Sequence, residues 1–76
     1  MEKYVIKNNL PNKIIEPTRE MNRKEAAVHF MGLQYHLNVN NYNTKMVFRN
    51  QDGKDLRGTI QVEIDSFYYY VELYKV

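Results

Sequence analysis

The sequence predicts a small α+β domain in which one helix packs on a three-stranded antiparallel meander, alone or with an additional N-terminal strand (β-α-β-β-β). Two observations carry this prediction. Apolar residues recur at helical spacing over residues 26–37, and apolar and polar residues alternate along the second half of the chain. The 76 residues suffice for a single domain. We expect 1–19 to be a less regular segment and 20–76 to form the helix and the sheet.

Composition narrows the class of protein. The chain has no cysteine, which excludes disulfides and thiolate zinc sites and favours an intracellular protein. No apolar run reaches the ~18 residues of a membrane span, and the start lacks the apolar stretch of a signal peptide. We therefore expect a cytoplasmic protein without a membrane partner. Abundant Asn and an excess of Lys over Arg are typical of an AT-rich genome, such as that of a phage or mobile element.

The helix has recognisable ends. KYVIK alternates weakly and favours a short strand, whereas NNLPNKIIEPT contains two prolines and is typical of a loop or edge segment. Asn22 then suits an N-cap, and Glu25 completes a pattern like a capping box. The Asn-rich stretch NVNNYN ends the helix, since Asn favours caps and turns. The apolar stripe of the helix consists of Ala26, Phe30, Leu33 and Leu37.

The strands TKMVFRN and LRGTIQVEID flank a turn in QDGK. A three-residue turn, residues 51–53, places Gly53 at a left-handed position. It sets Phe48 opposite Leu56 and Met46 opposite Gly58, which keeps both apolar faces on one side. The same register pairs Arg49 with Asp55 on the outer face.

Asp65-Ser66 forms the next turn and leads into the last strand, SFYYYVELYKV. This register pairs Ile64 with Phe67, Val62 with Tyr69 and Ile60 with Val71. On the outer face it sets Tyr68, Tyr70 and Tyr74 against Glu63, Gln61 and Arg57, respectively. The predicted core is Ala26, Phe30, Leu33, Leu37, Met46, Phe48, Leu56, Ile60, Val62, Ile64, Phe67, Tyr69, Val71 and Leu73.

The helix carries a second apolar side that such a small domain does not need. Val28, Met31 and Tyr35 lie roughly opposite Phe30 and Leu33 on a helical wheel. Two explanations are open. Either residues 10–15, with three large aliphatic side chains, fold over this outer side, or the side contacts another chain, as exposed apolar patches commonly do.

No residue pattern indicates catalysis, a metal or a cofactor. His29 and His36 share one helix face but stand ~10 Å apart along the axis, too far to ligate one ion. The single serine, Ser66, lies in a turn, and no Gly-rich phosphate loop occurs. We therefore expect a protein that is not an enzyme.

Nucleic-acid binding is an alternative. The stretch NRKEAAVHFMGL is compatible with the first half of a helix-turn-helix, but QYHLNVNNYN lacks the Lys and Arg of a recognition helix. A second route uses Lys45, Arg49 and Arg57 for phosphates and the outer tyrosines for stacking on single-stranded bases. The net charge of +2 is modest for this role, and acidic residues lie among the basic ones.

Our leading hypothesis is a non-enzymatic protein-binding module, such as a phage effector that inhibits or redirects a host protein. The contact would be carried by exposed aromatic and apolar residues, for which Tyr is a common choice. A nucleic-acid binder is the first alternative, and a self-assembling component, for example a homodimer, is the second. The candidate contact residues are Tyr68, Tyr70, Tyr74, Val28, Met31 and Tyr35.

Overall fold

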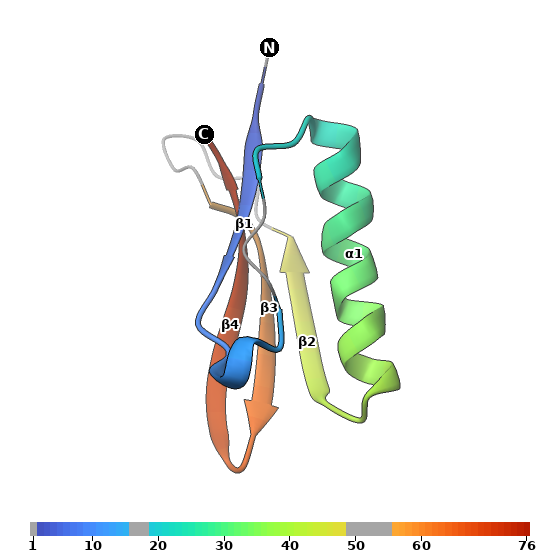
Figure 1. The fold of residues 1–76 in the computed structure, drawn as a ribbon, viewed down its shortest axis with the longest axis vertical. Coiled ribbons are helices and arrows are strands. Elements are labelled where there is room, and N and C mark those ends of the chain that lie inside the picture. The colour runs from blue at the N-terminus through green and yellow to red at the C-terminus, as the bar shows by residue number, and fades with distance from the viewer. Residues whose placement is uncertain (1, 16–18, 49–55) are drawn as a thin grey trace.

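The computed structural model describes residues 2–15, 19–48 and 56–76. Its elements are β1 (Tyr4–Asn8), a 3-10 turn η1 (Pro11–Lys13), α1 (Arg23–Val39), β2 (Asn43–Phe48), β3 (Leu56–Ile64) and β4 (Phe67–Lys75). The strands form one antiparallel sheet in the order β1-β4-β3-β2 (Figure 1). The predicted α+β class is confirmed, and the N-terminal strand is present.

Strand β1 joins the sheet beside β4, so that β4 is an interior strand. Tyr4 lies opposite Lys75, and the Val76 N–H donates a hydrogen bond to the Lys3 carbonyl (2.8 Å). Side chains alternate between the two faces of β1. Tyr4 and Ile6 point to the core face and are buried, while Val5 between them points to the other face and is half-buried. Both ends of the described chain therefore lie side by side at one end of the sheet.

Helix α1 has the predicted start. The Glu25 N–H donates to Asn22 Oδ1 (2.9 Å), and the Asn22 N–H donates to Glu25 Oε1 (3.3 Å), which completes a capping box. At the other end Asn41 adopts a left-handed backbone (φ 67°), and the Tyr42 N–H donates to the Leu37 carbonyl (3.0 Å). This is a Schellman ending, with Asn in the position that glycine most often takes.

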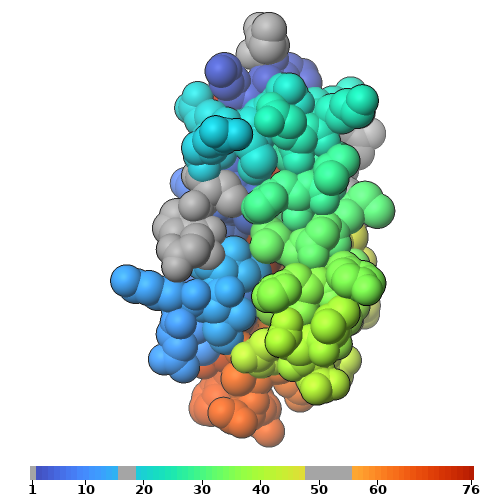
Figure 2. Space-filling view, turned by 45° about the vertical axis from the view of Figure 1, so that its right-hand side comes forward, coloured from blue at the N-terminus to red at the C-terminus, as the bar shows by residue number. Residues whose placement is uncertain are grey.

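The core lies on one face of the sheet, beneath α1 and residues 9–15, which run side by side over it (Figures 1 and 2). Leu10 and Ile15 are buried in this core, so the explanation in which residues 10–15 cover the outer side of the helix is wrong. These residues complete the cover of the sheet because one helix is too narrow for four strands. The buried core is Tyr4, Ile6, Leu10, Ile15, Met21, Ala26, Phe30, Leu37, Ile60, Val62, Val71 and Leu73.

Several predicted core residues lie elsewhere. Phe67 is 68% exposed, because the tip of the β3–β4 hairpin extends past the end of α1 (Figure 1). Leu56 is half-buried and is not among the residues packed against the core. The side chain of Phe48 is not among those that the structure describes. Four other predicted residues are partly buried and pack against the core: Leu33, Met46, Ile64 and Tyr69. The remaining predicted residues are buried in the core.

The β2–β3 register differs from the prediction by two residues. Met46 lies opposite Ile60, and Phe48 lies opposite Gly58. A shift of two keeps the residues of β2 and residues 58–64 of β3 on their predicted faces, so facing alone did not determine the register. The predicted turn at residues 51–53 and the Arg49–Asp55 pair lie outside the described residues.

The β3–β4 register is confirmed from the turn to Ile60. It then shifts between Leu56 and Gly58, where Tyr74 pairs with Leu56. Arg57 is the extra residue of a β-bulge, and the predicted Tyr74–Arg57 pair is wrong.

We expect Ile6→Ala to lower the free energy of unfolding by about 2–5 kcal/mol, because it leaves a cavity in the core. The neighbouring Val5→Ala is the matched control. It removes two methyl groups from the other face and should cost less than about 1 kcal/mol. Urea unfolding followed by circular dichroism measures both. Equal losses would contradict the facing of β1.

We expect Ser66→Gly to raise the free energy of unfolding by about 1 kcal/mol. Asp65 and Ser66 form the two-residue turn between β3 and β4 and have positive φ angles of 51° and 71°. A side chain makes this backbone costly, and glycine removes the cost. Ser66→Ala, which keeps the Cβ atom, should give no gain in the same urea titration. A gain of equal size for Ala would show that the backbone angle is not the cause.

Candidate protein-binding surfaces

The side of the sheet opposite the core is its open face, because neither α1 nor residues 9–15 lie on it. Strand alternation and register place polar and aromatic side chains there. The interior strands β3 and β4 carry its centre, and β1 and β2 carry its edges. Its residues include Val5 and Lys7 of β1, Asn43, Lys45 and Val47 of β2, Thr59, Gln61 and Glu63 of β3, and Tyr68, Tyr70, Glu72 and Tyr74 of β4.

The three predicted tyrosines share this face but differ in access. Tyr68 is 56% exposed and Tyr70 is 38% exposed, whereas Tyr74 is half-buried. The Lys7 ammonium lies 5.4 Å from the centre of the Tyr74 ring, a cation–π contact. Tyr74 is thus already in use within the sheet, and Tyr68 and Tyr70 are the rings available for a partner.

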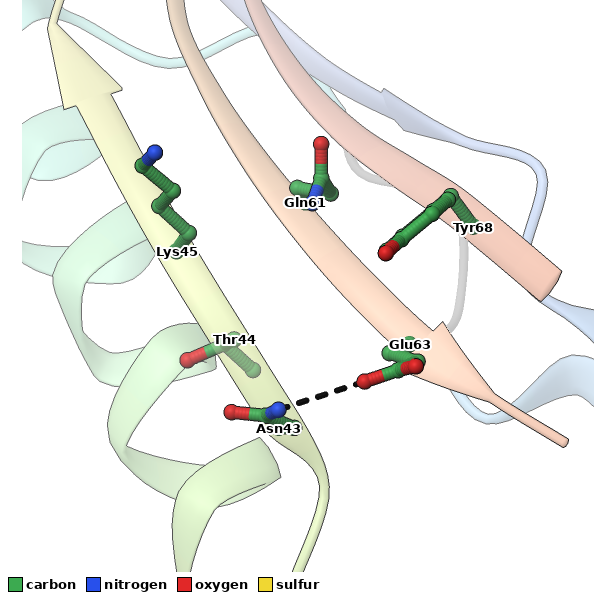
Figure 3. A pocket seen from close by; sticks show the side chains of 6 residues that line it. All are labelled: Asn43, Thr44, Lys45, Gln61, Glu63 and Tyr68. Atoms are coloured by element: carbon green, nitrogen blue, oxygen red, sulfur yellow. Dashed lines mark hydrogen bonds between the residues drawn. The ribbon is translucent and has the colours of Figure 1, made fainter. Parts of the chain in front are cut away.

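A hollow of about 320 Å³ lies beside Tyr68. Figure 3 shows the Tyr68 ring pointing from β4 toward β3, between Gln61 and Glu63. On the other side of the hollow the Asn43 Nδ2 donates to Glu63 Oε1 (3.2 Å), and Lys45 stands beside this pair on β2. An aromatic wall with amide, carboxylate and ammonium groups around it suits a polar segment of another molecule.

Thr44 also lines the hollow, but its hydroxyl is used elsewhere. It donates to Asn38 Oδ1 (2.6 Å) and accepts from Gln34 Nε2 (3.3 Å), which ties β2 to the end of α1. This contact fixes the β2 wall of the hollow relative to the helix.

The basic residues predicted for nucleic acid do not form one cluster. Lys45 is exposed beside the hollow. Arg57 lies at the bulge near the other end of β3, where its Nη1 donates to the Leu56 carbonyl (3.4 Å). Arg49 lies outside the described residues. Glu63 and Glu72 occupy the same face as Lys45, so its charge is mixed.

A second exposed surface is the helix stripe, which consists of Val28, Met31, Tyr35 and Val39. These side chains are 67%, 57%, 73% and 59% exposed. At 100° per residue they lie opposite the buried Ala26, Phe30 and Leu37. The first three were predicted from helical spacing; Val39 was missed because the Asn-rich end concealed the last turn of the helix. The predicted contact residues therefore belong to two separate surfaces, on the helix and on the open face.

A shallow hollow of about 440 Å³ adjoins the helix stripe at Val28. Basic side chains surround it, and its one acid, Glu25, is engaged in the capping box. Its lining is Arg19, Met21, Lys24, Glu25, Val28 and His29.

Within 2–15, 19–48 and 56–76, no three His, Cys, Asp or Glu side chains are grouped to hold a metal ion. His29 and His36 are both exposed on α1. No helix in this part of the chain has the length and apolar content that crossing a bilayer requires. Comparison of the chain with family models, curated proteins and solved structures found no match.

Two tyrosines have raised pKa values. Burial raises the pKa of Tyr74, and the neighbouring Glu72 carboxylate adds to the effect. Burial also raises the pKa of Tyr4, whose hydroxyl donates to Glu2 Oε2 (2.9 Å). The hydrogen bonds that Glu2 accepts from Lys75 and Tyr4 lower its own pKa, and Lys75 Nζ lies 3.1 Å from its Oε1.

We expect Tyr4 and Tyr74 to ionise above the usual tyrosine pKa of about 10. In the unfolded chain both ionise near pH 10, so their contribution to stability is complete below that pH. It is lost as the pH rises through their raised values. Absorbance at 295 nm measures the ionisation, and Tyr4→Phe and Tyr74→Phe should each remove one late step. The urea-unfolded chain is the control. Unchanged high-pH absorbance in both variants would contradict the assignment.

Proposed function

We propose that this chain is a non-enzymatic protein-binding module whose open face captures a partner without transforming it. The observation that carries the proposal is the position of Tyr68 and Tyr70. Both rings are exposed, yet they belong to β4, which pairs with β3 from Phe67 to Tyr74 and with β1 from Val71 to Lys75, and Asn9 bonds the Tyr70 backbone. Rings on a rigid strand lose little conformational entropy on binding, and Tyr is common at interface hot spots.

The surroundings of Tyr68 support a protein partner. Asn43, Gln61, Glu63 and Lys45 provide hydrogen-bond donors, acceptors and both signs of charge around one ring. This matches an interface with an aromatic centre and a polar rim. The partner we propose is a host protein in the cytoplasm, with this chain as a small phage effector that inhibits or redirects it. Composition alone motivates the phage origin.

Single-stranded nucleic acid is the second candidate, because Lys45 and Tyr68 line the same hollow. An ammonium beside an aromatic ring can hold a phosphate while a base stacks. Glu63 in the same hollow opposes phosphate. The two candidates differ in salt dependence, since phosphate contacts weaken steeply as salt rises.

We expect Tyr68→Ala/Tyr70→Ala to abolish capture of the partner and leave the fold intact, since both rings face away from the core. Tagged protein incubated in nuclease-treated host lysate, washed at moderate salt and analysed by mass spectrometry measures capture. Tyr35→Lys on the helix stripe is the matched control and should retain the same protein near stoichiometry. Circular dichroism checks folding of each variant.

The outcomes separate the candidates. A protein retained by the unchanged chain and lost from the double variant supports the module. Nucleic acid retained without nuclease, and released as salt rises, would favour the second candidate. Retention that survives the double substitution would contradict the assignment of Tyr68 and Tyr70.

A further inference from the structure

Three residues of the helix stripe, Val28, Tyr35 and Val39, have with Gly32 the spacing of a coiled-coil seam. Counting Gly32, the exposed positions Val28, Gly32, Tyr35 and Val39 are separated by four, three and four residues. This is the alternation of a and d positions, which keeps one side of a helix against another helix. In Figure 2, α1 lies along the surface of the molecule, where a second helix can reach it.

The seam is complementary to its own reversed copy. When two α1 helices lie antiparallel, Val28 of one comes level with Val39 of the other, and Gly32 comes level with Tyr35. Each layer then repeats by two-fold symmetry, as an interface between identical subunits requires. The large Tyr35 ring meets the smallest residue of the facing helix, so the knob of one helix has a hole in the other.

The antiparallel pair gives a reason for a glycine at position 32, and the fold of the single chain does not. It lies in the interior of α1, where glycine is a poor helix former. A Cβ atom built there meets nothing within 4 Å, so nothing in the described fold requires the missing side chain. Close approach of a second helix does require it.

Charge selects the antiparallel orientation. Lys24 is exposed in the first turn of α1, where the helix dipole disfavours a cation. In the antiparallel register it lies about one turn past Val39 of the other helix, near the carbonyl groups that form the negative end of that helix's dipole. In a parallel pair the two lysines and the two positive helix ends would lie together.

The area of the stripe sets the strength of the contact. With the exposures given above, the seam residues Val28, Tyr35 and Val39 and the flanking Met31 together present roughly 450 Å² per copy, or about 900 Å² for the pair. Stable interfaces bury about 1,200–2,000 Å² in total, so this pair falls below that range. The area therefore corresponds to a weak, concentration-dependent dimer.

We propose that α1 pairs with α1 of a second copy of this chain, antiparallel, through Val28, Gly32, Tyr35 and Val39. The surface is separate from the open face, so the dimer stands independently of the proposed function. It leaves Tyr68 and Tyr70 of both copies free, which gives two partner-binding faces in one assembly.

Sedimentation equilibrium from about 10 µM to about 1 mM tests the pairing. We expect a reversible dimer with a Kd on the order of 10–100 µM. Tyr35→Lys should raise the Kd at least tenfold, because it removes the ring and adds charge to the seam. Tyr68→Lys, the same change on the open face, should leave the Kd unchanged, and circular dichroism should show equal helix content. A monomer at the highest concentration, or equal effects of the two variants, would overturn the proposal.

Disulfide trapping tests the orientation, because the chain has no other cysteine. We expect a mixture of Val28→Cys and Val39→Cys chains to form a mixed disulfide dimer under mild oxidation, with little crosslinking of either variant alone. In the antiparallel pair, two residues at position 28 stand about 16 Å apart along the axis, beyond the reach of a disulfide. Efficient crosslinking of each variant with itself would indicate a parallel pair and overturn the proposed register.

Discussion

The pairing of β1 with β4 is the contact on which the rest of the structure depends. It converts the C-terminal strand from an edge strand into an interior one and brings Tyr4 and Ile6 into the core. It also starts the segment 9–15 on the core side of the sheet. Without this pairing, one helix would face three strands with an incomplete core, and the tyrosines of β4 would lie on a free edge.

Among the described residues, the helix and residues 9–15 cover only one face of the sheet, and this asymmetry leaves both candidate surfaces exposed. The helix and residues 9–15 use their apolar groups on one face, so the opposite face keeps Tyr68 and Tyr70 exposed. No other described segment lies outside the helix, and its stripe remains exposed. A chain of 76 residues is too short to cover three layers.

Local signals predicted local structure well. Three features depend only on residues close in sequence, and the sequence predicted all of them: the capping box at Asn22, the turn at residues 65–66 and the β3–β4 pairs near that turn. The β2–β3 register was not, because a shift of two residues keeps the same faces, and the bulge at Arg57 has no side-chain signature. Facing predicted the tyrosines of the open face, but the contact of Lys7 with Tyr74 required the position of β1. The predicted core was wrong where burial depends on tertiary position, as at Phe67 in the exposed hairpin tip.

The proximity of the first and last strands has a consequence for synthesis. A ribosome adds about 5–20 residues per second, so β1 leaves the exit tunnel seconds before β4 exists to receive it. During that interval Tyr4 and Ile6 are apolar groups on an unpaired strand, open to chaperones and to neighbouring nascent chains. The core can therefore close only after β4 has been made and has left the tunnel.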